Sequence, residues 1–260
     1  MNFLKMISIM NIKEKTKLLN TISFVFGIFL IAFLVQLASV LKGDNLVFPD
    51  IIKIIKTFFL LLSKKETYLL ITTTFFHLLV TLVISFSFGL LTGLFQGFSN
   101  FFHKLTSPLM SLLRSMPMIV LTVIIMVLSD YQNVPYIVTS LVLIPIISEA
   151  VCHGIKNIDR DLIDAYLLFT NFNLKVFFTV YIPLIKGYLH QAFVNSVGMG
   201  IKVIVTAEYL VQCKNSLGKA VFESTYFNEY EEIYAYALIM VLIVLLVTKL
   251  PDFQLKKIKK

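Results

Sequence analysis

Two charged side chains lie toward the middle and outer half of the apolar stretch from residue 184 to residue 211. Lys202 and Glu208 are six residues apart, which places them about 120° apart around a helix, so they do not form a local ion pair. A charge inside a membrane span is costly and commonly marks a solute or ion path, or a partner charge on another helix. Each side chain must therefore find a partner elsewhere or line a wet cavity, and the residues alone leave both interpretations open.

Two further charges lie near the ends of apolar segments. Arg114 is about two turns from one end of its segment, so its long side chain can snorkel to the membrane surface. Glu149 is near the end of the next segment and could simply face water. Together with Lys202 and Glu208, these residues are our candidates for a translocation path.

The chain lacks the sequence patterns of nucleotide and bond-cleaving chemistry. It contains no G-x-x-x-x-G-K-[ST] phosphate loop, no H-E-x-x-H and no G-x-S-x-G, and the pair Gly218-Lys219 is isolated. Its two cysteines, Cys152 and Cys213, have no metal-ligand spacing. The prediction is a protein that is not an enzyme and has no cofactor or metal of its own.

The composition is typical of a membrane protein. The chain has 260 residues, a mean hydropathy of +0.86 and 15% charged residues, whereas a soluble domain has roughly 25%. Its net charge of +8 matches the basic excess found at the ends of membrane helices, so it predicts a lipid bilayer and no nucleic acid as partner.

Six segments are long and apolar enough to cross a bilayer. They predict an all-α integral membrane protein whose spans are residues 22–41, 69–98, 108–128, 134–152, 184–211 and 233–250. Pro117 should kink the third span. The predicted organisation is an N-terminal segment at residues 1–21, a membrane domain at 22–250 and a basic tail at 251–260.

Residues 46–62 have a different character. Asp50, Lys53 and Lys56 form one polar stripe on an otherwise apolar segment whose uncharged part is too short to span. This pattern predicts a helix that lies in the headgroup plane.

Three glycines share one face of the second predicted span. Gly89, Gly93 and Gly97 are spaced four residues apart, and such a face lets another helix approach closely. Chance spacing in a glycine-tolerant membrane helix is the alternative.

The distribution of Lys and Arg predicts the orientation. With the N-terminus inside, fourteen of these residues lie on the cytoplasmic side and seven on the outer side. Both termini, and the charged loop between the fourth and fifth spans, should therefore be cytoplasmic.

This central loop, from Glu149 to Pro183, is the longest charged interruption in the middle of the chain. Its apolar residues recur at helical spacing at positions 158, 162, 163, 167 and 168, then at 174, 177 and 178. Asp159 or Asp161 could cap a first short helix, and Asn171 or Asn173 marks the break before a second. The apolar face is too large for a simple connector and predicts a docking partner.

The same loop resembles a known motif. Asp164-Ala165-Tyr166, three residues, Thr170, nine residues and Val180-Tyr181-Ile182-Pro183 resemble the EAA loop of binding-protein-dependent ABC importer permeases. The family pattern has Glu-Ala-Ala, then Gly, then Ile-x-Leu-Pro at the same spacing, so Tyr166 and Thr170 depart from it. Residues 112–117 and 216–219 further resemble the nitrate/sulfonate/taurine branch of these permeases.

The resemblance implies the translocation subunit of an ATP-driven importer in the bacterial cytoplasmic (inner) membrane. Its implied partners are a dimer of ABC ATPase subunits that bind ATP and Mg²⁺, a second permease copy forming a homodimer, and an extracytoplasmic solute-binding protein. Residues 153–183 would dock on the ATPase. The docking residues would be Asp161, Leu162, Asp164, Ala165, Tyr166, Leu167, Thr170 and Pro183.

Two other functions remain open at this stage. A secondary, ion-coupled transporter would need a coupling-ion site and usually internal repeats, and the sequence shows no repeat. A non-transport membrane scaffold would explain the central loop but not the intramembrane Lys202 and Glu208. The solute itself, whether a sulfonate, nitrate or a vitamin precursor, is left open.

Overall fold

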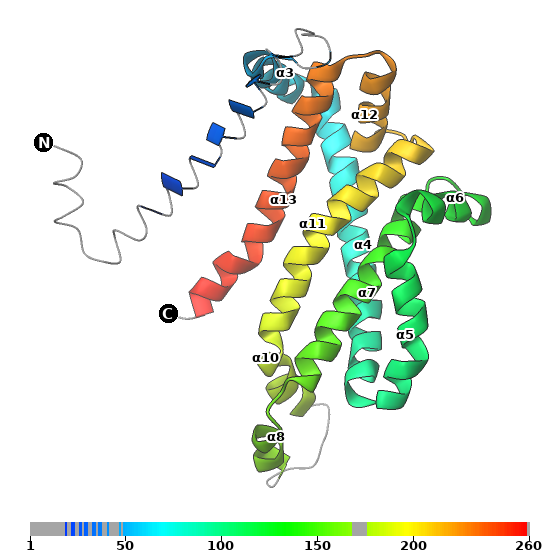
Figure 1. The fold of residues 1–260 in the computed structure, drawn as a ribbon, viewed down its shortest axis with the longest axis vertical. Coiled ribbons are helices and arrows are strands. Elements are labelled where there is room, and N and C mark those ends of the chain that lie inside the picture. The colour runs from blue at the N-terminus through cyan, green and yellow to red at the C-terminus, as the bar shows by residue number, and fades with distance from the viewer. Residues whose placement is uncertain are drawn as a thin grey trace, which may run out of the picture.

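The computed structural model of the chain consists of helices joined by short connections (Figure 1). It describes residues 49–167 and 176–258, together with scattered residues between 19 and 47. The loop residue Thr170 thus lies outside the described residues, and the predicted first span at residues 22–41 is described only at scattered positions. No strand occurs in the part of the chain that is described.

The helices follow one another along the chain with few intervening residues. They are α3 (Ile51–Ser63), α4 (Lys65–Phe98), α5 (Asn100–Ser115), α6 (Met118–Leu128), α7 (Val134–Lys156), α8 (Arg160–Leu167), the π-helix η1 (Phe177–Tyr181), α10 (Ile182–Leu184), α11 (Lys186–Val211), α12 (Leu217–Tyr226) and α13 (Tyr230–Ile258).

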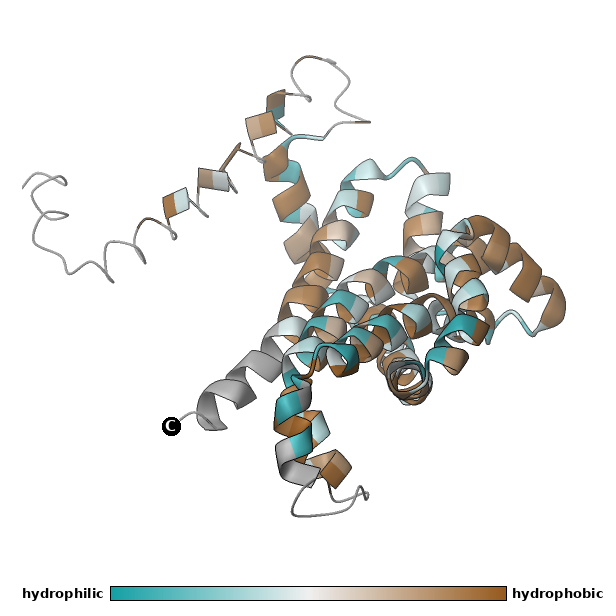
Figure 2. Ribbon diagram, turned by 60° about the horizontal axis from the view of Figure 1, so that its bottom comes forward, coloured by the Kyte–Doolittle hydropathy of each residue, from teal (hydrophilic) through white to brown (hydrophobic). Residues whose placement is uncertain are grey.

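Among the described residues, four helices are long and apolar enough to cross a membrane. They are α4, α7, α11 and the Tyr230–Thr248 part of α13, which correspond to four of the predicted spans. Large apolar side chains such as Phe76 on α4 and Leu246 on α13 are exposed, as expected of lipid-facing surfaces. Hydrophobic residues run along most of the long helices (Figure 2). The predicted all-α, multi-pass membrane fold is confirmed.

The predicted third span differs from the structure. Instead of one kinked helix over residues 108–128, α5 and α6 are separate helices bent by 104°. Met116 and Pro117 are both extended, with ψ values of 127° and 131°, because the residue before a proline avoids the helical region and proline itself cannot continue the hydrogen-bond ladder. The break is at the predicted proline, but it separates two helices where the sequence predicted a kink within one.

The predicted interfacial segment forms α3, which lies across one end of the bundle (Figure 1). Its polar stripe contacts the start of α13, where Lys53 Nζ is 3.7 Å from Glu231 Oε1 and the Thr57 hydroxyl donates to Glu231 Oε2 at 3.3 Å. The stripe therefore fastens α3 to α13 in addition to facing solvent.

The core lies where α4, α7, α11 and α13 meet, and it includes the buried residues Leu78, Ile147, Ile204 and Ile239. The closest helix pair in this core is α4 and α7. A Cβ atom added at Gly89, Gly93 or Gly97 would come within 2.6 to 2.7 Å of atoms of α7. All three glycines therefore lie directly against that helix, and a larger side chain would push the two backbones apart.

Replacement of the middle glycine tests this contact. Gly93→Ala should lower the midpoint of thermal unfolding, because the new Cβ would lie 2.6 Å from the Ser148 carbonyl oxygen and overpacking of this kind costs about 1–3 kcal/mol. The measurement is thermal unfolding of the full-length chain in detergent.

The matched control is Gly198→Ala on α11, where an added Cβ meets nothing within 4 Å. Both changes add the same methyl group to a helix, so they share any gain in helix propensity. A Gly93→Ala protein as stable as Gly198→Ala would contradict the close contact.

Candidate functional site

One face of α11 carries a line of exposed residues that no other part of the described chain covers. Gln191, Asn195, Lys202 and Thr206 are all exposed, and their spacing of four, seven and four residues places them on the same side of the helix. Gln191 donates a hydrogen bond to Asn195 at 2.9 Å. We call these four residues the α11 polar line.

Polar groups of this kind are costly against lipid. The line therefore faces water or another subunit, and Lys202 supplies its only formal charge. Lys202 was predicted from its charge, whereas Gln191, Asn195 and Thr206 were not predicted. Their common spacing with Lys202 was the signal that would have found them.

Glu208, on the same helix, has the opposite environment. Its side chain has no exposed surface, so the prediction that it lines a wet path is wrong for this structure. The carboxylate lies between α4, α11 and α12, and accepts hydrogen bonds from the Thr74 hydroxyl at 2.9 Å and the Gly218 backbone N–H at 3.1 Å. It also lies 2.7 Å from Nδ1 of His77, so its alternative role, as a cross-helix partner, is the observed one.

These contacts attach the start of α12 to the membrane helices. The Thr74 hydroxyl accepts from the Leu217 N–H at 2.9 Å, and the Ser216 hydroxyl caps α12 by accepting from the Lys219 N–H at 3.2 Å. A Cβ at Gly218 would lie 2.4 Å from Glu208 Cβ, so only glycine allows the first turn of α12 to rest on α11. The N–H groups that a helix start leaves unpaired are thus satisfied by side chains of other helices.

Arg114 and Glu149 form an ion pair that joins α5 to α7. Both side chains are slightly less than half exposed, and both line a small cavity with His103 and Cys152. Arg114 therefore does not simply snorkel, and Glu149 does not simply face water. Their pairing places one charge of each sign beside the break between α5 and α6.

The predicted docking segment projects from the end of the bundle opposite α12 (Figure 1). Its first helix is α8, and the Asp159 carboxylate accepts from the Asp161 N–H at 3.0 Å, which identifies Asp159 as the residue at its start. Asp161 and Asp164 are exposed, and so is the apolar Leu162, at 56%. For Ala165, Tyr166 and Leu167 only the backbone is described, and it is helical.

The inner side of α8 borders a cavity of about 440 Å³ between α8 and the ends of α4 and α7. Ile163 and Asp164 line it together with Tyr181, which is buried at the end of η1. Burial raises the pKa of the Tyr181 hydroxyl above its usual value, and the Asp164 carboxylate raises it further. Pro183 follows, exposed, in α10. The segment thus presents one side to the bundle and leaves the side with Leu162 open.

The fold and these features together define a multi-pass membrane permease. The family model of the binding-protein-dependent transport system inner membrane component matches residues 85–260. The chain therefore belongs to this family, and the resemblance stated from its sequence is confirmed. The branch within the family is not tested and stays a prediction.

A solved structure titled as inward-facing conformations of the MetNI methionine ABC transporter is similar to the chain. The TM-score is 0.61 at 18% sequence identity, over 74% of this chain and 97% of the other. At that identity the likeness shows the fold alone. Among curated proteins, no sequence matches this chain. Membership of the permease family sets aside the two other functions considered above, a secondary transporter and a scaffold.

The buried network around Glu208 should dominate stability at its end of the bundle. Glu208→Ala leaves the Gly218 N–H and the Thr74 and His77 side chains without their shared acceptor, and removing one member of a buried charged network costs about 3–5 kcal/mol. We expect a marked drop in the unfolding midpoint of the full-length protein in detergent.

Glu223→Ala on α12 is the control, because Glu223 is exposed and its pairing with Lys219, at 3.3 Å, is a surface contact within one helix. Such pairs contribute about 0.5 kcal/mol or less. Equal losses of stability in the two variants would show that the Glu208 network has no special role.

Proposed function

We propose that this permease is the translocation subunit of an ATP-driven importer, and that the α11 polar line forms its half of the solute path. The observation that carries the proposal is the exposure of Gln191, Asn195, Lys202 and Thr206 on a helix long enough to cross the membrane. Lipid is a poor solvent for all four side chains. A water-filled path between two copies of the chain would satisfy both lines at once.

The orientation follows from the Lys and Arg residues. The positive-inside rule places α8 in the cytoplasm and puts α3, α12 and the start of α13 on the outer side. An extracytoplasmic solute-binding protein would then deliver the solute at the α12 end. Inside the cell, α8 would meet the ATPase dimer, which binds ATP and Mg²⁺.

The docking site that we propose for the ATPase is the outward side of α8. Leu162 is a large apolar residue that α8 leaves exposed, and Asp161 and Asp164 are exposed charged residues close to it in the sequence. Short amphipathic helices bind in grooves of partner proteins through apolar anchors of this kind. Thr170 and the side chains of Ala165, Tyr166 and Leu167 remain proposed members of the same surface.

Coupling requires that a movement of the docked helix α8 changes which side of the membrane the path opens to. In this proposal ATP binding closes the ATPase pair, and α8 transmits the movement to α7 and α11, which flank it in the chain. The path would then open alternately to the two sides. Arg114 and Glu149 would hold α5 to α7 near the cytoplasmic end of that path.

Thiol labelling tests the α11 polar line. In a background with both buried cysteines, Cys152 and Cys213, replaced by serine, Asn195→Cys and Lys202→Cys should each react with a membrane-impermeant thiol reagent in at least one nucleotide state. The control is Val241→Cys, at an exposed apolar position of α13 that should face lipid and stay unlabelled. If all three cysteines are equally protected in every nucleotide state, the line is not part of a wet path.

Charge reversal tests the docking surface. Leu162→Asp combined with Asp164→Lys should reduce copurification of the coexpressed ATPase about tenfold or more, because losing a buried anchor at an interface commonly costs over 1.4 kcal/mol. The permease should still insert with an unchanged unfolding midpoint, since both side chains are exposed.

The matched control carries two changes at the other end of the molecule, at the exposed residues Phe227 and Glu229. Phe227→Asp with Glu229→Lys should leave ATPase copurification intact. A complex that forms and transports normally with the α8 variant would sink the docking assignment.

A further inference from the structure

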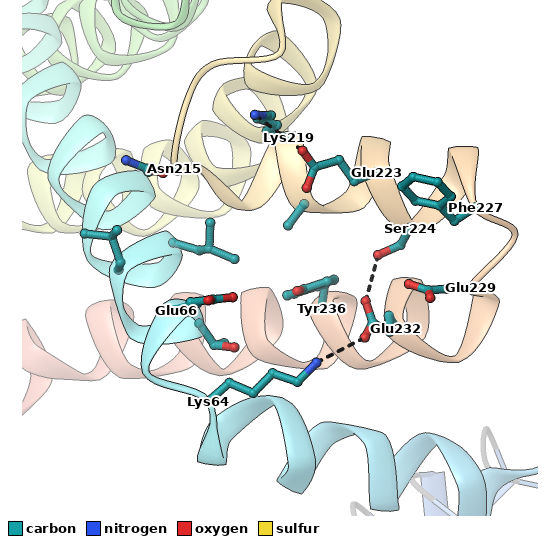
Figure 3. Close-up of a pocket in the computed structure, with 14 residues that line it drawn as sticks. Lys64, Glu66, Asn215, Lys219, Glu223, Ser224, Phe227, Glu229, Glu232 and Tyr236 are labelled. Atoms are coloured by element: carbon teal, nitrogen blue, oxygen red, sulfur yellow. Dashed lines mark hydrogen bonds and ion pairs between the residues drawn. The ribbon is translucent and has the colours of Figure 1, made fainter.

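A cavity of about 680 Å³ opens at the end of the bundle opposite α8 (Figure 3). It lies between the start of α4, helix α12 and the start of α13, and no residue of α11 lines it. This volume is typical of sites for small molecules. The cavity is thus separate from the α11 polar line and independent of the role proposed for that line.

This cavity is lined mainly by acidic residues, although the whole chain is basic. Its lining includes the glutamates Glu66, Glu223, Glu229 and Glu232 but only two lysines, in a chain of net charge +8. Lys64 lies 3.6 Å from Glu232 and Lys219 lies 3.3 Å from Glu223. Within the described part of the chain, no cation pairs with Glu66 or Glu229, so the cavity keeps two uncompensated negative charges.

Tyr236 supplies a second and independent indication of a ligand. Its side chain is only 6% exposed, and it projects from α13 into the space between the glutamates (Figure 3). No hydrogen bond joins its hydroxyl to another group among the described residues, whereas the neighbouring Ser224 hydroxyl donates to Glu232 at 3.1 Å. The Tyr236 residue is buried as a whole, and its hydroxyl is left open to the cavity.

We propose that this cavity binds a small organic cation that carries primary ammonium groups. The carboxylates of Glu66 and Glu229 would accept hydrogen bonds from ammonium groups, and the Tyr236 hydroxyl oxygen would accept another. The rings of Tyr236 and Phe227, which both line the cavity, add faces that attract a cation.

A bare metal ion fits the cavity less well. A divalent metal needs several oxygen ligands converging within about 2.0–2.6 Å of one point. Among the described residues, no group of three acidic, histidine or cysteine side chains is placed to hold a metal. A cation whose charges are separated by a short carbon chain matches carboxylates that stand on different helices.

The test uses 1,4-diaminobutane as the probe and the full-length protein purified from membranes with the subunits that copurify. Thermal unfolding is followed during titration at constant ionic strength. We expect a saturable rise in the unfolding midpoint, because a ligand that binds only the folded state stabilises it. Glu66→Gln with Glu229→Gln should abolish the rise, and Tyr236→Phe should weaken the apparent affinity about tenfold.

The control variant is Glu231→Gln, because Glu231 neighbours Glu232 in sequence but pairs with Lys53 and lines a different cavity. It should bind the probe as the unaltered protein does. No saturable shift, the same shift in the double variant, or the same shift with sodium chloride would overturn the proposal. A saturable shift with Mg²⁺ that the double variant also loses would overturn it in favour of a metal ion.

Discussion

The bilayer offers no water to polar groups, so each must be satisfied inside the protein or must reach water or another subunit. Helix α11 meets this constraint in two ways. On one side Glu208 is fully buried and is held by three groups from α4 and α12. On another side Lys202 is exposed. The need of polar groups for partners thus attaches α12 to the bundle through Glu208. It also leaves the α11 polar line to be covered by water or another subunit.

Small residues set how closely the helices around α11 approach one another. The glycine face of α4 lies against α7, and Gly200 of α11 adds a further close contact. A Cβ there would lie 2.9 Å from Leu78 of α4 and 3.3 Å from Leu143 of α7. Because Gly200 adds no side chain to this contact, α11 lies close to α4, and the side chains of Thr74 and His77 on α4 reach Glu208. Close packing and the buried polar network therefore depend on each other.

Local patterns predicted much of this fold. The long apolar segments became α4, α7, α11 and α13. The polar stripe of α3 was identified from three residues, and Asp159 was one of two proposed starts for α8. These features depend on residues close together in the sequence, so hydropathy and capping rules were sufficient. The position of the break at Pro117 was equally local.

Pairings between distant segments could not be predicted in the same way. The partner of Arg114 is 35 residues away, and the partners of Glu208 on α4 are more than 130 residues away. Their position in or near apolar segments showed that both charges need a partner or water, but it could not show which helix would supply the partner. The angle between α5 and α6 was missed for a related reason, since a proline fixes where a helix ends and the packing of the flanking helices determines the direction of the next one.

The end of α7 and the start of α11 are tightly packed against each other. Gly154 near the end of α7 lies against Ile185 and Tyr188 at the start of α11, where an added Cβ would meet both at 3.2 Å. Asn157, just past α7, donates to the Tyr188 hydroxyl at 3.1 Å. Helices α7 and α11 are therefore joined at this end of the bundle, so a displacement of one loads the other. If the ATPase docks on α8 as proposed, its closure acts on α7 and α11 as one unit, and the polar line that begins at Gln191, one turn above this joint, shifts with it.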